Sequence, residues 1–242
     1  MNIAGYIKTS VIEWPGKITS VIFVPGCNFR CPFCHNADLV KKQNLEFFEE
    51  EKVLENLKER REWVEAVAVT GGEPTLQPDL SLFLKKLKRL EFLVMLETNG
   101  TRPKIIAKLM KEKLVDYWAM DLKGDFDNYS NYTNCPNDQI VKNVKESMQL
   151  IAKSGEEYEF RTTVVPGLHN LENLTKLANQ IGEIFKNFKL KIENCHWYLQ
   201  RFQPQNTLDS KFLKVRPYSK EEMESFQRHL REKIPNIFLR GI

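Results

Sequence analysis

The chain has 242 residues, of which 42% are hydrophobic and 28% charged; these values are typical of a globular protein and exclude a disordered or collagen-like chain. It contains no apolar run long enough to cross a bilayer and no secretory signal pattern at its N-terminus, so we expect a cytoplasmic protein that does not enter membranes. The net charge of +4 comes from acids and bases interleaved along the chain, which predicts no nucleic-acid-binding surface.

Short β-branched and apolar runs, most of them ended by glycine, proline or a polar residue, predict a series of strands. The expected strands cover residues 19–24, 66–70, 92–96, 117–120, 158–165 and 196–202, with a short final one at 237–239. Apolar residues at helical spacing predict helices between these strands. The expected helices lie within residues 47–64, 80–87, 103–110, 140–151 and 171–185, and a capping box at residues 219–222 opens a last one.

Strands that alternate with helices and are continuously apolar are typical of a parallel sheet covered by helices. Six strand–helix units are too few for a closed eightfold barrel, and an open, curved partial (β/α)6 barrel fits them better than a flat doubly wound sheet, although periodicity alone does not separate the two. No repeat, linker or low-complexity segment interrupts the pattern, so residues 1–242 are predicted to form a single α/β domain. In either arrangement a ligand site belongs at the carboxyl ends of the strands.

Three of the five cysteines lie close together, directly after the first expected strand. Cys27, Cys31 and Cys34 can hold three corners of a metal centre, and a [4Fe–4S] cluster with only three cysteine ligands keeps one iron open for another molecule. The alternative is a structural zinc site with His35 as fourth ligand, although zinc ligands usually come as two spaced pairs and Cys34 and His35 are adjacent. The other two cysteines stand alone and are expected to be ordinary core or surface thiols: Cys135 and Cys195.

Glycine and polar residues also follow the later strands, at the edge of the predicted sheet where the cysteine loop lies. Two adjacent glycines after the second strand let a ligand approach the backbone closely, although the segment can also be read as a simple turn. A buried cation on the fifth strand would be costly without a partner. The residues concerned are Gly71, Gly72 and Glu73 after the second strand, Glu97, Thr98 and Asn99 after the third, Asp121 and Lys123 after the fourth, and Arg161 on the fifth.

The Cys-x3-Cys-x2-Cys loop, with Phe33 before its third cysteine, resembles the motif of the radical S-adenosylmethionine (SAM) superfamily. The segment 71–73 resembles the methionine-binding motif of that superfamily. His35-Asn36, together with the segments 97–100, 121–123 and 161–167, is similar to the glycyl-radical-enzyme activating proteins. Two further segments, Trp-Pro-Gly-Lys at 14–17 and Tyr-Leu-Gln-Arg-Phe at 198–202, resemble the branch that activates anaerobic ribonucleoside-triphosphate reductase. The resemblance covers nearly the whole chain and implies a partial barrel of the radical SAM type.

The resemblance also implies the cofactors and the role of each residue. Cys27, Cys31 and Cys34 would hold one [4Fe–4S] cluster per chain, at which SAM is reductively cleaved. The product would generate a glycyl radical on a partner enzyme. The expected SAM contacts are the backbone of Gly71, Gly72 and Glu73 for the amino group, Lys123 and Arg161 for the carboxylate, Thr98 and Asn99 near the ribose and methionine, and Phe33 and His35 beside the adenine.

The expected partner is a glycyl radical enzyme, most like anaerobic ribonucleotide reductase, and the expected reductant is of the flavodoxin or ferredoxin type. A pyruvate formate-lyase-type activating enzyme is the alternative within this class. In that branch an Asp stands where this chain has Glu97, in a site associated with a monovalent cation. Because the side chain of Glu is longer, we do not infer that cation for this chain. Activators with ferredoxin-like domains insert more cysteines directly after the first motif; this chain has none there, which predicts a single cluster. A zinc-binding module and a simple iron–sulfur carrier are more remote alternatives, and neither gives the segment 71–73 a role.

Overall fold

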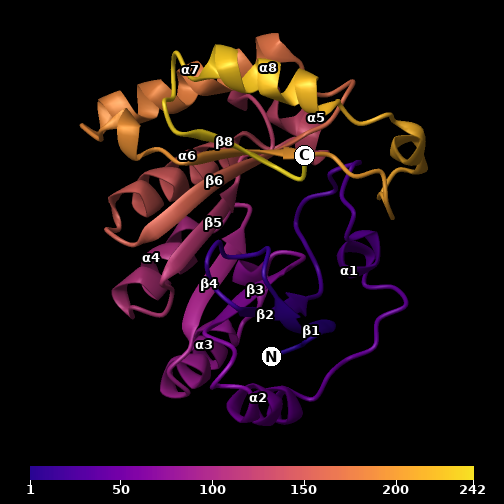
Figure 1. Ribbon diagram of the computed structural model, residues 1–242, viewed down its shortest axis with the longest axis vertical. Coiled ribbons are helices and arrows are strands. Elements are labelled where there is room, and N and C mark those ends of the chain that lie inside the picture. The colour runs from indigo at the N-terminus through magenta and orange to yellow at the C-terminus, as the bar shows by residue number, and fades with distance from the viewer. The chain divides into compact units, whose positions relative to one another are not determined.

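The computed structural model describes residues 1–242, which form eight strands, eight α-helices and four short 3-10 helices (Figure 1). The chain divides into two compact units. Unit 1 comprises Met1–Asn28, Asp38–Thr98 and Lys104–Ala119. Unit 2 comprises Phe29–Ala37, Asn99–Pro103 and Met120–Ile242.

The sheet of unit 1 is parallel except at its first strand. β1 (Gly5–Ser10) pairs antiparallel with β2 (Thr19–Val24), and β2, β3 (Ala66–Gly71) and β4 (Leu93–Thr98) follow in parallel. Nearly every side chain of β2 and β3 is buried, which explains why both strands are continuously apolar in the sequence. The prediction of parallel strands at these positions is confirmed.

Amphipathic helices connect the strands of unit 1. α2 (Glu50–Glu59) buries Val53 and Leu57, and α3 (Leu80–Arg89) packs its apolar stripe against β4. α4 (Pro103–Lys111) begins at the proline that the sequence indicates as a helix start. The remaining short elements are α1 (Ala37–Lys41), at the junction of the two units, and the 3-10 helix η1 (Pro74–Leu76).

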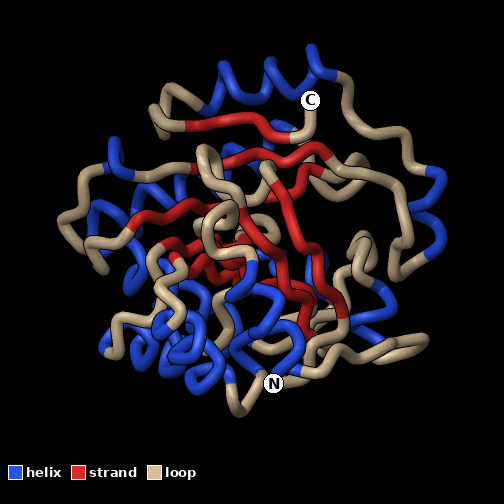
Figure 2. Tube along the Cα trace, turned by 60° about the horizontal axis from the view of Figure 1, so that its bottom comes forward, coloured by secondary structure: helices blue, strands red, loops and turns tan.

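Unit 2 repeats the same pattern of parallel strands and helices. β6 (Glu157–Val164), β7 (Trp197–Arg201) and β8 (Ile237–Arg240) are parallel neighbours. α8 (Lys220–Leu230) lies along β8, beside the C-terminus in Figure 2. The capping box predicted at residues 219–222 is present at the start of α8. The other helices of this unit are α5 (Tyr129–Thr133), α6 (Asp138–Lys153) and α7 (Leu171–Asn187), with the 3-10 helices η2 (Phe126–Asn128), η3 (Ile192–Asn194) and η4 (Ser210–Lys214).

β5 (Tyr117–Asp121) begins in unit 1 and ends in unit 2. Just before it, the N–H of Asp116 donates to the carbonyl of Val94 at 2.8 Å. Just after it, the N–H of Leu122 donates to the carbonyl of Arg161 at 2.7 Å. The strand therefore runs beside β4 at its start and beside β6 at its end. No helix in the structure has the length and apolarity that crossing a bilayer requires.

Candidate functional site

The glycine segment after β3 is fixed by hydrogen bonds to the segment that leads into the cysteine loop. The N–H groups of Gly72 and Glu73 donate to the carbonyls of Val24 and Gly26, both at 2.8 Å. Gly71 has a φ of +111°, a conformation that side chains other than glycine rarely adopt. A Cβ on Gly72 would lie 2.0 Å from the carbonyl oxygen of Gly26, so this close approach requires a glycine.

The carboxylate of Glu73 points inward and is fully buried. It accepts a hydrogen bond from the backbone N–H of Thr75 at 3.0 Å and from the hydroxyl of Thr98 at 2.8 Å. Glu73 thereby caps η1 and ties the end of β3 to the end of β4. A ligand at this segment meets its backbone rather than this carboxylate.

Glu97 and Thr98 lie within β4, whereas the sequence predicts them just after a strand. Both side chains have partners in unit 1: the hydroxyl of Thr70 donates to Glu97 at 2.6 Å, and the hydroxyl of Thr98 donates to Glu73 at 2.8 Å. Unit 1 therefore has Glu97 and Thr98 in the last two positions of β4, and Cys27 and the segment 71–73 at or just after the ends of β2 and β3.

The rest of the cysteine loop lies in unit 2 and is a tight turn. The N–H of Cys34 donates to the carbonyl of Cys31 at 3.0 Å. The N–H groups of Leu208 and Asp209 donate to the carbonyls of Cys34 and Pro32, at 3.0 and 2.9 Å. A segment after β7 thus holds the loop, and this contact could not be predicted because its residues lie about 175 positions apart in the chain.

Lys123 and Asp121 form an ion pair at 2.7 Å beside this loop. Burial of Lys123 lowers its pKa, but the negative charges of Asp121, Cys31 and Cys34 outweigh this effect and raise it above the usual value. Burial raises the pKa of the Cys34 thiol, and Lys123 opposes that shift. The prediction that Asp121 and Lys123 share one side of the strand end is confirmed.

His169 is a buried residue that the sequence analysis did not single out, and it contacts two of the predicted site residues, Phe33 and Lys123. Its ring is almost fully buried and bridges two loops: Nδ1 accepts from the N–H of Val165 at 3.1 Å, so Nε2 donates to the carbonyl of Lys123 at 2.9 Å. It stacks on Tyr132 at 4.8 Å between ring centroids and meets the edge of Phe33 at 6.3 Å. Burial lowers the pKa of His169 to about 4, which keeps the ring neutral.

Arg161 is buried, as the sequence predicts, and it has the partner that its burial requires. Its Nε donates to Glu159, two residues earlier on the same face of β6. Arg240 on β8 binds the same carboxylate through two nitrogens, at 2.7 and 2.9 Å. Burial alone would raise the pKa of Glu159, but the two guanidinium groups outweigh it and lower the pKa.

The other predicted cofactor residues of unit 2 differ in exposure. Phe33 is buried against the rings of His169 and Phe212, whereas His35 is exposed. Asn99 is buried, and its side-chain oxygen accepts from the N–H and the hydroxyl of Thr101, at 3.0 and 2.7 Å. Unit 2 therefore brings Phe33 and Lys123 together around His169, and holds Arg161 in its own ion pair.

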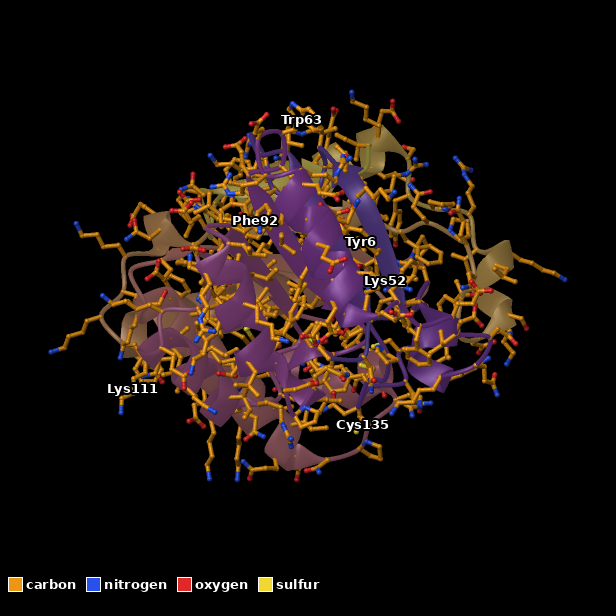
Figure 3. All side chains as sticks on the ribbon, turned by 90° about the horizontal axis from the view of Figure 1, so that it is seen from below. Tyr6, Lys52, Trp63, Phe92, Lys111 and Cys135 are labelled. Carbon is orange, nitrogen blue, oxygen red and sulfur yellow. The ribbon has the colours of Figure 1, made fainter.

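The two lone cysteines differ from those of the loop. Cys195 is fully buried, and burial raises the pKa of its thiol above the ordinary range. Cys135 is half-buried on the segment between α5 and α6 (Figure 3). Neither follows a strand. Within either unit, no three Cys, His, Asp or Glu side chains converge as the ligands of one metal ion would. Cysteines that each bind a different iron of a cluster lie farther apart than the ligands of a single metal ion.

Comparisons with known proteins were made at the level of sequence and of fold. Residues 21–181 match the Radical SAM superfamily. A putative glycyl-radical enzyme activating enzyme of Methanocaldococcus jannaschii is 31% identical over 246 residues, which cover 99% of this chain and 96% of that protein. The pyruvate formate-lyase-activating enzyme of Clostridium pasteurianum is 26% identical over 230 residues, covering 92% of this chain and 93% of that protein.

The structure of Streptococcus suis SuiB bound to S-adenosylmethionine has a TM-score of 0.63 against this chain at 15% identity. The match covers 91% of this chain and 52% of SuiB, so the chain spans about half the length of that protein. A likeness at this identity shows a shared fold. The predicted α/β fold class, with parallel strands of the radical SAM type, is confirmed.

Proposed function

Because the chain belongs to the radical SAM superfamily and, within it, to the glycyl-radical enzyme activating enzymes, we propose that it generates a glycyl radical on an anaerobic ribonucleoside-triphosphate reductase. The observation that carries the activating role is the match to the archaeal relative along almost the full length of both chains. The choice of reductase as partner is supported by the segments 14–17 and 198–202, which resemble that branch.

The cofactors of this family are a [4Fe–4S] cluster and SAM. The residues present fit them, because the donor set is three cysteines of one loop and a cationic side chain lies beside two of them. We propose Cys27, Cys31 and Cys34 as the cluster ligands. When bound, the two cofactors together supply the one-electron cleavage of SAM on which hydrogen abstraction from a glycine depends.

The chain's own residues would bind and orient SAM. In unit 1, the backbone of Gly71, Gly72 and Glu73 offers N–H and carbonyl groups to an amino acid, and buried Glu73 holds this backbone in place. Thr98, which shares that carboxylate, would lie near the ribose and methionine.

In unit 2, Lys123 and Arg161 would attract the carboxylate of SAM, since both remain cationic near neutral pH. Phe33 and His35 would flank the adenine, and Asn99 would approach the ribose. The buried rings of Phe33 and His169 exclude water from their side of the loop.

We also propose that residues 1–242 act as one radical SAM domain with a single cluster, because the family match at 21–181 takes in residues of both units. The proposed reductant is a flavodoxin- or ferredoxin-type protein. The second candidate partner is pyruvate formate-lyase, since the activating enzyme of that protein in Clostridium pasteurianum is 26% identical over most of this chain.

The test is anaerobic incubation of the reconstituted chain with SAM, dithionite and each candidate partner, followed by electron paramagnetic resonance. We expect a glycyl radical on the reductase, with about one 5′-deoxyadenosine formed per radical. A reductase variant with the target glycine changed to alanine is the control and should give no radical. A radical on pyruvate formate-lyase alone would move the proposal to the second candidate. Repeated turnover of a small molecule without any partner protein would contradict both.

A further inference from the structure

The imidazole ring of His169 is fixed in its orientation by the turn that carries it. The backbone N–H of His169 donates to the carbonyl of Val165 at 2.7 Å, and the N–H of Val165 donates to Nδ1 of the ring at 3.1 Å. The carbonyl of His169 accepts a hydrogen bond from the hydroxyl of Tyr218 at 2.7 Å. Because Nδ1 is an acceptor, the proton of the neutral ring lies on Nε2, which donates to the carbonyl of Lys123 at 2.9 Å.

The hydrogen bond from Nε2 reaches the backbone of Lys123 at the point where the chain leaves the sheet. Leu122 still pairs with β6, since its N–H donates to the carbonyl of Arg161 at 2.7 Å. The backbone of Lys123 instead binds two side chains: its N–H donates to the hydroxyl of Tyr129 at 3.2 Å, and its carbonyl accepts from His169. The side chain of lysine is long and flexible, so the position of its ammonium group depends on how this backbone is held.

The same ring also packs against Phe33 of the cysteine loop. The two rings meet edge to face, with centroids 6.3 Å apart and planes at 79°. Phe33 is buried, and the ring of Phe212 lies near it at 6.5 Å between centroids, while His169 stacks on Tyr132. Because side chains in such an interior are closely packed, loss of one ring leaves space into which its neighbours can move. His169 therefore holds Lys123 by a hydrogen bond and Phe33 by ring packing.

We propose that His169 is a positioning residue for SAM, which places Lys123 for the carboxylate through its hydrogen bond and Phe33 for the adenine through its ring. The inference rests on the proposed function, in which Lys123 and Phe33 contact these two ends of SAM. Because the two contacts of His169 differ in kind, one substitution can remove the hydrogen bond and another can remove the ring. A residue needed only for folding would not affect the two ends of SAM separately.

The test uses methionine and 5′-deoxyadenosine as competitors of SAM in equilibrium dialysis of the anaerobically reconstituted protein. His169→Phe keeps a ring beside Phe33 but has no donor for the carbonyl of Lys123. We expect its affinity for methionine to fall about tenfold, the upper range for one hydrogen bond, and its affinity for 5′-deoxyadenosine to stay unchanged. His169→Gln keeps a donor but loses the ring, so its affinity for 5′-deoxyadenosine should fall about tenfold and that for methionine should stay unchanged. Neither variant has Nδ1, so the lost bond from Val165 is common to both.

His196→Phe and His196→Gln are the matched controls, because His196 is an exposed residue of the same unit that also contacts aromatic rings. Both should bind the two competitors like the parent. The inference is overturned if the two His169 variants do not differ in the competitor that they weaken, or if they differ in the reverse order. A parent chain that holds a full cluster but binds no SAM would instead overturn the proposed function, and the inference with it. Should His169→Phe fail to fold, His169→Met takes its place, since it also fills the space beside Phe33 without a donor, and the same outcomes decide.

Discussion

The two units differ in the kind of residues that they place at their strand ends. The strands of unit 1 present a face of small and apolar residues, among them Val21, Ala66, Ala68 and Met95. The strands of unit 2 carry charge on one face, where Glu159, Arg161 and Arg240 meet. At its strand ends unit 1 has backbone that glycine leaves accessible, whereas unit 2 has charged side chains that are paired with one another. We therefore expect an added side chain to reduce the stability of unit 1. We expect the removal of a charge from unit 2 to weaken SAM binding.

The largest expected effect concerns the three cysteines proposed as cluster ligands. Replacing Cys27, Cys31 or Cys34 by alanine should abolish cluster binding, whereas the parent should hold about four irons per chain after anaerobic reconstitution. Iron analysis and visible absorption measure the result.

The matched controls are Cys135→Ala and Cys195→Ala, which should leave the iron content unchanged. Loss of iron on changing either lone cysteine would contradict a single cluster bound by the loop.

Adding a methyl group at Gly72 tests the contribution of unit 1. The new Cβ would meet the carbonyl of Gly26 at 2.0 Å, so backbone must move, and we expect a loss of about 3 kcal/mol in the free energy of unfolding. Gly182→Ala is the control, because nothing lies within 4 Å of its Cβ and alanine is favoured in a helix, so that variant should gain about 0.5–1 kcal/mol. Urea unfolding measures the free energy of unfolding of both variants and of the parent. Equal stabilities would show that the close approach at Gly72 is not required.

The pH dependence of stability tests the role of the neutral His169 ring, which connects two loops of unit 2. The pKa of His169 falls from the ordinary value of 6.5 to about 4 in the folded chain, because the ring is buried. Between these two pH values the unfolded chain binds more protons than the folded chain. The free energy of unfolding is therefore unaffected by His169 above the upper value and decreases as the pH falls toward the lower one. The expected loss is about 3 kcal/mol.

Urea unfolding at a series of pH values, for the parent and for His169→Gln, measures this loss. The parent should lose more stability than the variant between pH 6.5 and about 4. Parallel curves for the two proteins would mean that His169 is not the group responsible.

Removing one charge from unit 2 has the smallest expected effect. Lys123→Ala should weaken SAM binding by about 1.5–3 kcal/mol, the worth of a charge-assisted hydrogen bond, while the cluster still assembles. Equilibrium dialysis measures the affinity, and Lys176→Ala, which removes an exposed cation paired with Asp127, is the control. Unchanged affinity would leave Lys123 as a structural partner of Asp121 only.

Much of the fold could be predicted because buried parallel strands have a continuous apolar signal. β1 was missed, since its exposed Lys8 and Thr9 break that signal and the strand pairs on one side with β2. The cysteine loop could be identified from its spacing, whereas the glycine segment can also be read as a simple turn and gained its expected role from the family resemblance. His169 and Glu159 could not, because their importance lies in partners that are distant in the chain: His169 meets the loop of Lys123, and Glu159 meets Arg240.

The two hydrogen bonds from Leu208 and Asp209 to the cysteine loop bear on when this protein can receive its cluster. A chain is synthesised from its N-terminus, so the cysteines emerge long before the segment that holds their loop. We expect ribosome-bound chains that stop short of residue 205 to retain iron poorly, and chains extended past η4 to retain it. The thiols would then stay accessible to oxygen for most of the time of synthesis, so oxygen present while the chain is being made would oxidise them before a cluster can be held.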